Sequence, residues 1–222
     1  MNAAGRRLIP ERLQRAFLGA LAPLVRLLTR RGVSPNLLTL AGVLITGFAA
    51  AAFLLQLPRA GGLLVLLGGL CDAIDGSLAR HAGRATRFGA LLDSSVDRYS
   101  EFLMLFGIGG FFFLSRDTLS AAATFLALCG SFMVSYTRAR AESLGLAAKV
   151  GVMQRPERIV FLGVGALIHP VALSVAVWLV AVFANITALQ RLRFAFRQDS
   201  APAESSDEQH EIKTVPFSNR GC

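Results

Sequence analysis

The sequence predicts an all-α integral membrane protein with six transmembrane helices, preceded by a juxtamembrane amphipathic helix. Hydrophobic residues make up 54% of the chain, above the roughly 45–50% that is usual in soluble domains. The apolar segments are about 20 residues long, which is the length needed to cross about 30 Å of hydrocarbon. Charged residues gather between these segments, apart from one acidic stretch that is discussed below.

The first 33 residues are expected to form an amphipathic helix on the membrane surface. Apolar residues recur at helical spacing at Leu13, Phe17, Leu21 and Leu24, in a segment that also carries seven arginines. Such a helix lies in the plane of the interface. Ser34 is then expected to cap the next helix, with Pro35 in its first turn. This first apolar span begins too late and is too long for a cleavable signal peptide.

Six membrane spans are expected within one membrane domain at residues 34–197. They cover residues 35–57, 61–82, 88–114, 118–142, 156–168 and 170–194. His169 and Pro170 separate the last two spans and predict either a tight turn or a kink. Residues 198–222 are polar and rich in Ser, Glu and Asp, so we expect a disordered tail.

The net charge of +9 is better explained by membrane topology than by nucleic-acid binding, because the arginines lie between apolar spans. One side of the membrane would carry the N-terminal helix, the 81–87 turn, the 138–158 segment and the arginines at 191–197. The other side has little beyond Arg59 and Arg116. The positive-inside rule makes the arginine-rich side cytoplasmic, together with both termini. Membrane lipids are expected partners on this side, and nucleic acid is not.

Four aspartates interrupt the apolar pattern within "CDAIDGSLARHAGRATRFGALLDSSVDRYSE", residues 71–101. Asp72 and Asp75 are three residues apart, and Asp93 and Asp97 are four apart, so each pair occupies one helical face. One Asp at the centre of a transmembrane helix costs roughly 2.5–3.5 kcal/mol, and four facing lipid would cost on the order of 10 kcal/mol. We therefore expect the four to face a wet cavity, a cation, or both.

The spacing of the aspartates favours a cation. Asp75 and Asp93 are each nine residues from Arg84, while Asp72 and Asp97 are twelve and thirteen residues away. In an antiparallel hairpin the two pairs would meet at matching depth on the cytoplasmic side. All-oxygen ligands without Cys or His suit Mg²⁺ or Mn²⁺. The three cysteines lie far apart and indicate neither a zinc site nor a disulfide framework.

The neighbours of the aspartates leave room for a substrate that carries phosphate. Gly76 and Ala79 share the face of the first pair, and Gly89 shares the face of the second. Arg80 and Thr86 are candidates to hold phosphate oxygens. A structural alternative stays open, because Gly and Ala also allow helices to pack closely.

These residues follow the pattern D-x2-D-G-x2-A-R-x8-G-x3-D-x3-D, which resembles the signature of the CDP-alcohol phosphatidyltransferase family at every fixed position. The six-span layout and "SPNLLTLAG" extend the resemblance over most of residues 1–197. The resemblance implies an enzyme that binds CDP-diacylglycerol and transfers its phosphatidyl group to an alcohol, releasing CMP. It also implies two divalent metal ions, Mg²⁺ or Mn²⁺.

The resemblance assigns a role to each residue of the pattern. Asp72, Asp75 and Asp93 would be metal ligands, and Asp97, which also borders the metals, would be the general base. The expected contacts to the CDP-lipid are Asn36, Thr39, Gly76, Ala79, Arg80, Thr86 and Gly89.

A second stretch, "SYTRARAESLGLAAKVGVMQRPERIVFLG", is similar to the corresponding part of bacterial phosphatidylinositol phosphate synthases. That similarity implies inositol 1-phosphate as the acceptor. Its phosphate would be bound by Arg138, Arg155 and Arg191, with Arg158 in addition. Arg138 stands where Lys is expected in close relatives, which changes the geometry of the contact. Glycerol 3-phosphate stays open as an alternative acceptor, since it too carries a phosphate.

Membrane topology alone would explain any single arginine in this stretch, and it applies with most force to Arg140 and Lys149. The resemblance further implies a homodimer in the bacterial cell membrane, with its active site on the cytoplasmic side.

Two other classes of protein make different predictions. A cation transporter would continue its acidic groups across the bilayer or show an inverted repeat, whereas the opposite half of this chain has no carboxylate except Asp117. A structural scaffold would have no function that requires four aspartates, so nothing would offset the free energy needed to place them in the membrane.

Overall fold

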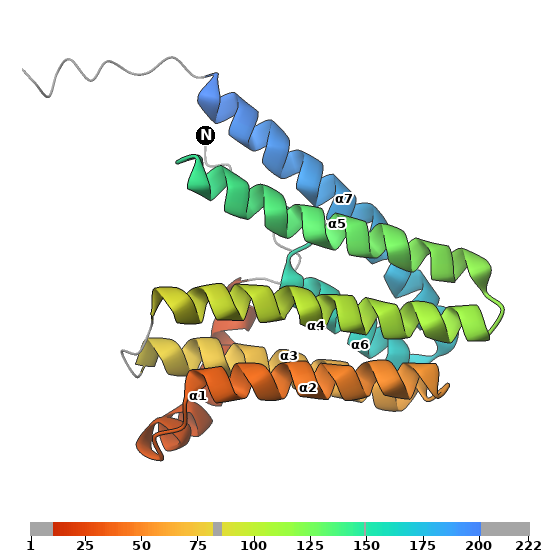
Figure 1. Ribbon diagram of the computed structural model, residues 1–222, viewed down its shortest axis with the longest axis horizontal. Helices are drawn as coiled ribbons and strands as arrows, with labels where there is room; N and C mark the ends of the chain where they lie inside the picture. Colours follow the sequence, from red (N-terminus) through yellow and green to blue (C-terminus); the bar gives the residue numbers. More distant parts are fainter. Residues whose placement is uncertain (1–10, 82–85, 149, 201–222) are drawn as a thin grey trace, which may run out of the picture.

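The computed structural model describes residues 11–81, 86–148 and 150–200 (Figure 1). Within these ranges the chain forms seven helices and no strand, which confirms the all-α class. The helices are α1 (Glu11–Arg30), α2 (Pro35–Leu54), α3 (Pro58–His81), α4 (Arg87–Leu114), α5 (Thr118–Ser143), α6 (Arg155–Ile168) and α7 (Pro170–Asp199). The expected tail lies outside the described residues, except that α7 continues to Asp199.

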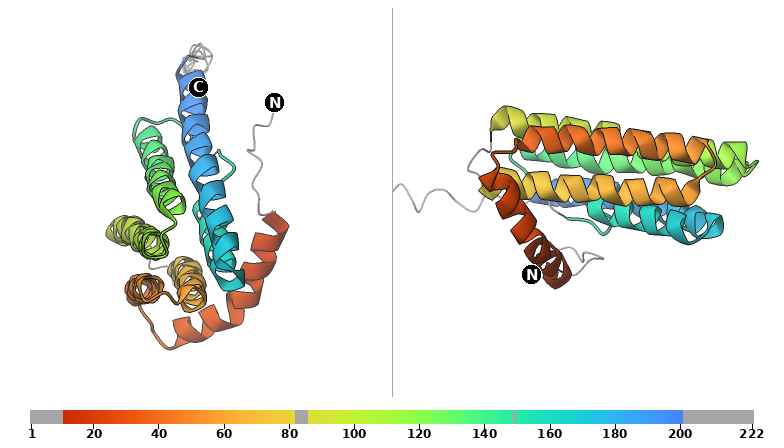
Figure 2. Two further views of the ribbon diagram at one scale, coloured as in Figure 1. Left: turned by 90° about the vertical axis from the view of Figure 1, so that its right-hand side faces the viewer. Right: turned by 90° about the horizontal axis from the view of Figure 1, so that it is seen from below.

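The helices form a bundle with one crosswise helix at its end. Helix α2 packs against both α3 and α4, α5 pairs with α7, and α6 packs against α3 and α7. Helices α5 and α7 lean together away from the α2–α4 group (Figure 1). Helix α1 runs across the end of the bundle at which α2 begins, where it contacts α3 (Figure 2). That end also holds the start of α4, whereas α6 begins farther along the bundle (Figure 1).

The structure corrects the simple hairpin expected for α3 and α4. The two helices run antiparallel, but the extensive contacts of each are with α2 and other helices rather than with each other. The side chain of Arg155, from α6, lies between Asp72 of α3 and Asp97 of α4. The two aspartate pairs therefore face a space to which a third helix contributes.

Four of the described helices are long and apolar enough to cross a membrane. They are α2, residues 58–80 of α3, α5 and α7. Helix α4 has 28 residues but carries Asp93, Asp97, Arg98 and Glu101 among its first 15. Helix α6 has 14 residues and is therefore about 21 Å long, less than the hydrocarbon thickness of about 30 Å.

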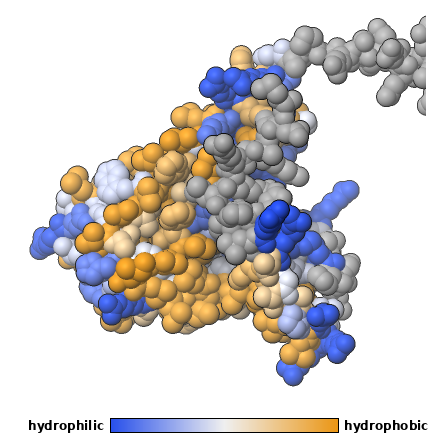
Figure 3. All heavy atoms as spheres, turned by 180° about the vertical axis from the view of Figure 1, so that it is seen from behind, coloured by the Kyte–Doolittle hydropathy of each residue, from blue (hydrophilic) through white to orange (hydrophobic). Residues whose placement is uncertain are grey.

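The outer surface of the bundle is apolar, as expected for a protein in lipid. Large side chains such as Phe48, Phe113, Leu119 and Phe125 are more than two-thirds exposed. A hydrophobic band covers the middle of the molecule, and hydrophilic residues lie toward its ends (Figure 3). In water such an extended apolar surface would be a liability, whereas in a bilayer it is the surface that lipid tails contact.

Helix α1 carries one broad apolar face. Val25, with Leu21 and Leu28, packs against Ile74 and Leu78 of α3. Beside them Phe17, Leu24 and Leu27 stay between 40% and 47% exposed. The helix can thus attach to the bundle with one part of this face and to the membrane interface with the exposed part.

The junctions match the sequence in detail. Ser34 precedes α2 and Pro35 is its first residue, although the Ser34 hydroxyl makes no capping hydrogen bond. Helix α6 ends at Ile168, and His169 is in an extended conformation with φ −166°. The His169 Nδ1 atom accepts a hydrogen bond from the Val171 N–H at 3.2 Å. The junction is therefore a tight turn that caps α7, not a kink in one long helix.

Gly107 is a position at which the backbones of α4 and α2 lie close together. A Cβ atom added at Gly107 would lie 2.5 Å from the Ala50 Cα atom. We expect Gly107→Ala to lower the free energy of unfolding by about 1–3 kcal/mol, because the helices would have to separate. Gly47→Ala, within α2, is the control, since an added Cβ would meet nothing within 4 Å. Thermal unfolding in detergent tests this, and equal melting temperatures for the two variants would contradict it.

Candidate active site

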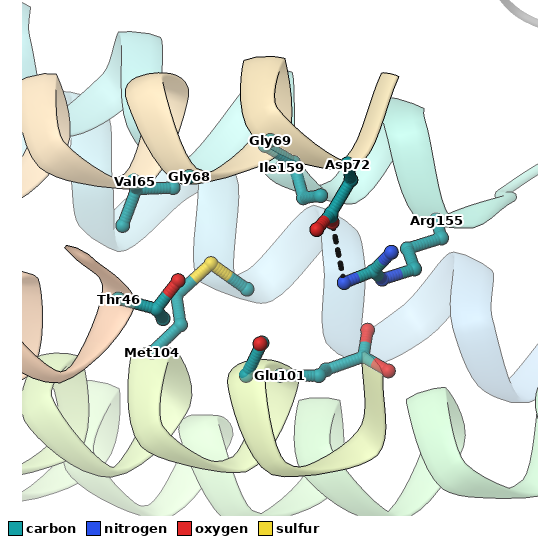
Figure 4. Close-up of a pocket in the computed structure, with 10 residues that line it drawn as sticks. Thr46, Val65, Gly68, Gly69, Asp72, Glu101, Met104, Arg155 and Ile159 are labelled. Carbon is teal, nitrogen blue, oxygen red and sulfur yellow. Dashed lines mark ion pairs between the residues drawn. The ribbon is translucent and has the colours of Figure 1, made fainter. Parts of the chain in front are cut away.

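Arg155 connects the two halves of the aspartate motif. Its Nη2 atom lies 2.7 Å from the Asp72 Oδ2 atom, and its Nη1 atom lies 2.6 Å from the Asp97 Oδ1 atom. All three side chains are largely buried, and Figure 4 shows the guanidinium directed at Asp72. The guanidinium, which stays protonated in proteins, is therefore held between two carboxylates.

Asp75 and Asp93 complete the acidic cluster. Asp75 is buried, and its Oδ2 atom accepts a hydrogen bond from the Thr39 hydroxyl at 2.7 Å. Asp93 is partly buried and lies within electrostatic range of Asp72 and Asp75. Thr39, expected beside the nucleotide, is thus 4% exposed and engaged with an aspartate. Its contact orients a carboxylate of the cluster.

The donor set suits a divalent metal ion, but the cluster is closed around Arg155. The cluster consists of the carboxylates of Asp72, Asp75, Asp93 and Asp97, which come from α3 and α4. The Arg155 guanidinium already bridges two of them. Among the described residues no three acidic, Cys or His side chains are arranged to share one ion. The chemistry of the residues therefore fits Mg²⁺ or Mn²⁺, provided that the guanidinium moves out of the bridge.

A small cavity adjoins this bridge on the side away from α1. It is lined by Thr46, Gly68, Asp72, Ser100, Glu101 and Arg155, among others (Figure 4). Its volume is about 20 Å³, which is room for about one water molecule. This cavity is too small for a nucleotide. The CDP group would therefore have to bind outside it, on the exposed side of the acidic cluster where α2 and α4 begin.

Several of the residues expected to contact CDP gather where α2 and α4 begin. Thr86 caps α4, and its Oγ1 atom accepts a hydrogen bond from the Gly89 N–H at 2.9 Å. A Cβ atom added at Gly89 would lie 3.8 Å from the Asn36 Oδ1 atom. Asn36 and Thr86 are exposed. Their polar groups therefore face outward beside the acidic cluster.

The remaining nucleotide candidates lie on α3. Gly76 and Ala79 are partly buried, and Arg80 is exposed. The Arg80 guanidinium approaches Gly76 and donates a hydrogen bond to the Ser77 hydroxyl at 3.3 Å. Gly76 leaves space that the Arg80 side chain partly covers.

The four arginines expected to bind the phosphate of the acceptor have different environments. Arg138 is exposed and pairs with Glu142 at 3.0 Å. Arg158 is 1% exposed and pairs with Glu101 at 2.6 Å. Arg191 is buried and donates hydrogen bonds to the backbone carbonyls of Val134 and Val150. Arg158 and Arg191 are therefore committed to protein groups.

Three residues of this site were missed by reasoning from the sequence. Glu101 lies one helical turn after Asp97 and binds Arg158, so the i, i+4 spacing that linked Asp93 and Asp97 would also have found it. Arg98 stands 3.7 Å from both Asp97 and Glu101. Gly42 of α2 backs the cluster, because a Cβ atom there would lie 3.2 Å from the Asp72 Oδ1 atom. Nothing in the sequence indicates that Gly42 contacts α3.

Comparison with known proteins decides which family this site belongs to. A model of the CDP-alcohol phosphatidyltransferases matches residues 32–189, which is more than half of the chain. The chain belongs to this family. It is therefore a membrane enzyme of the phosphatidyltransferase class, and the alternatives of a cation transporter and a scaffold are set aside. The matched region contains every aspartate of the acidic cluster.

Individual family members resemble the chain over most of its length. The archaetidylinositol phosphate synthase of Pyrococcus horikoshii is 41% identical over 162 residues, which cover 72% of this chain and 82% of that protein. A crystal structure of the Mycobacterium tuberculosis phosphatidylinositol phosphate synthase with CDP-DAG bound has a TM-score of 0.72 and 37% identity, covering 78% of this chain and 92% of that one. A second structure of that enzyme, in complex with manganese and citrate, has the same TM-score at 36% identity, covering 78% and 88%.

Proposed function

We propose that the enzyme transfers the phosphatidyl group of CDP-diacylglycerol to a hydroxyl of inositol 1-phosphate. The products are phosphatidylinositol phosphate and CMP. The similarity to phosphatidylinositol phosphate synthases over most of the chain supports this. The relatives' names agree on an inositol phosphate product but differ in the lipid, which is archaetidyl in one and phosphatidyl in the other.

The observation that carries the choice of acceptor is the position of Arg155. Its guanidinium lies 2.6–2.7 Å from two aspartates of the cluster, so a phosphate-binding group stands next to the reaction centre. A planar guanidinium binds phosphate oxygens in pairs. Serine and free inositol have no phosphate to use this group, whereas inositol 1-phosphate does.

The cluster supplies the groups for an in-line transfer. Asp72, Asp75, Asp93 and Asp97 would hold two divalent ions, Mg²⁺ or Mn²⁺, which when bound neutralise the carboxylates and stabilise negative charge on the pyrophosphate. Asp97 accepts the proton of the acceptor hydroxyl. The hydroxyl oxygen bonds to the phosphorus that carries diacylglycerol, and the bond from that phosphorus to the bridging oxygen breaks. That oxygen leaves with CMP.

The rest of the chain would place these groups at the membrane surface. We propose that α2–α7 make six crossings, within a membrane domain at residues 34–197 that lies between the juxtamembrane helix and the tail. The α1 end would be cytoplasmic in the bacterial cell membrane, because the positive-inside rule places the arginine-rich segments of the sequence on that side. The exposed polar groups of Asn36, Thr86 and Arg80 would then meet the CDP group there. A homodimer is proposed on the family resemblance.

A CMP-release assay tests the proposed reaction. Purified protein in detergent with CDP-diacylglycerol and Mg²⁺ is expected to release CMP with inositol 1-phosphate, at least about tenfold faster than with inositol, because Arg155 would bind the phosphate. Chelation of the metal by EDTA is expected to abolish release. Glycerol 3-phosphate and serine complete the screen. Release with glycerol 3-phosphate alone would contradict the acceptor, and no release with any of the four would contradict the transferase.

A further inference from the structure

Arg155 makes two ion pairs of nearly equal length with carboxylates that come from different helices. The Nη2 atom pairs with Asp72 at 2.7 Å and the Nη1 atom pairs with Asp97 at 2.6 Å. The Nε atom is buried and has no hydrogen-bond partner. The side chain thus gives both of its terminal nitrogens to this bridge and keeps one donor unused.

The bridge uses oxygen atoms that the proposed function needs for metal. A cation placed on the Asp72 Oδ2 and Asp97 Oδ1 atoms would stand beside a guanidinium of the same sign of charge, and the two would repel each other strongly at this depth. The arrangement of the described carboxylates agrees, since no three are gathered around one point while Arg155 separates two of them. The guanidinium and the ion therefore compete for the same oxygens.

A displaced Arg155 moves among other charged groups. Arg98 lies within electrostatic range of Arg155, and Arg191 lies within range of Arg98, Arg138 and Arg158. Glu101 and Asp93 also lie within range of Arg155. A phosphate bound among these arginines would offer the guanidinium paired acceptor oxygens.

We propose that Arg155 alternates between the Asp72–Asp97 bridge and the phosphate of the acceptor, and that the divalent ion decides which partner it has. This inference rests on the proposed function. Acceptor binding then follows metal binding, because the guanidinium is released only when the divalent ion binds the carboxylates of Asp72 and Asp97. By thermodynamic linkage the acceptor raises the affinity for metal by the same factor.

Mn²⁺ binding to the purified full-length protein, followed by electron paramagnetic resonance without CDP-lipid, tests the competition. Arg155→Gln is expected to bind Mn²⁺ at least about tenfold more tightly than the wild type. Arg98→Gln is the control, because it removes one positive charge 3.7 Å from Asp97 but no bridge. Arg155→Lys keeps the charge and loses the paired geometry, so its affinity is expected to lie between those of the wild type and Arg155→Gln.

Calorimetry tests the coupling to the acceptor, and its main measurement uses the unmutated protein. Inositol 1-phosphate is expected to bind at least about tenfold more tightly with Mn²⁺ than without it, and Arg155→Gln is expected to lose this enhancement. Equal Mn²⁺ affinity in Arg155→Gln and Arg98→Gln, or acceptor affinity independent of Mn²⁺, would overturn the inference. A wild-type protein that binds no Mn²⁺ would instead overturn the proposed metal site, and the inference with it.

Discussion

Asp97→Asn is expected to lower kcat by about 10²–10⁴-fold, because a positioned general base contributes roughly that much to a proton transfer. The asparagine has nearly the same shape but cannot accept the proton of the acceptor hydroxyl. Binding of CDP-diacylglycerol is expected to persist, since Asp75 and Asp93 remain in the cluster. CMP release gives kcat, and equilibrium binding of the CDP-lipid is measured on the same preparation.

Asp93→Asn separates the role of base from that of metal ligand. Asp93 belongs to the same cluster but is not the expected base, so its loss is expected to weaken metal binding. Raising the Mn²⁺ concentration should then restore much of the rate in Asp93→Asn and little in Asp97→Asn. Normal turnover by Asp97→Asn, or its full rescue by metal, would show that another group takes the proton.

Glu101→Gln is expected to lower the free energy of unfolding by about 3–5 kcal/mol. Glu101 and Arg158 are both at most 3% exposed, and the Arg158 Nε atom lies 2.6 Å from the Glu101 Oε1 atom. Removing the negative charge leaves a buried guanidinium with neutral acceptors, such as the Met153 carbonyl, in place of the carboxylate. Denaturant unfolding in detergent micelles, followed by the fluorescence of the single tryptophan, Trp178, measures the loss.

Glu142→Gln is the matched control for this ion pair. Arg138 and Glu142 pair through the same Nε and Oε1 atoms at 3.0 Å, but both side chains are more than 40% exposed. An exposed pair of this kind contributes about 0.5 kcal/mol or less. Combining Glu101→Gln with Arg158→Met is expected to recover most of the stability, because no buried charge is left without a partner. A loss in Glu101→Gln no larger than in Glu142→Gln would contradict the assignment.

The helices were predictable because their signals are local. The Ser34–Pro35 start of α2, the Thr86–Arg87 start of α4 and the His169–Pro170 break each follow from residues that are adjacent in sequence. The helix neighbours were less predictable. Helical spacing assigned Asp72 and Asp97 to facing sides, but it did not indicate that α2 packs against both α3 and α4 or that α6 reaches between them.

In the candidate site, too, some residues could be predicted from the sequence but their partners could not. The aspartates could be found because a carboxylate in an apolar chain is costly, and their spacing gives each pair one face. The partners of the arginines could not be found, because positive-inside topology and phosphate binding both place arginines at this end. Only the three-dimensional structure shows that Arg158 pairs with Glu101 and that Arg155 pairs with Asp72 and Asp97.

If α2–α7 make the six proposed crossings, the length of α6 sets how deep in the membrane the reaction takes place. Its 14 residues span about 21 Å, about 9 Å less than the hydrocarbon core, and it meets α7 at the end of the bundle opposite α1 (Figure 1). In the proposed six-crossing arrangement Arg155, its first residue, would therefore lie below the level of the lipid head groups. The lipid would keep its tails in the leaflet while a water-soluble polyol descends to it. The short helix would thus let a lipid and a water-soluble molecule react, although they share no solvent.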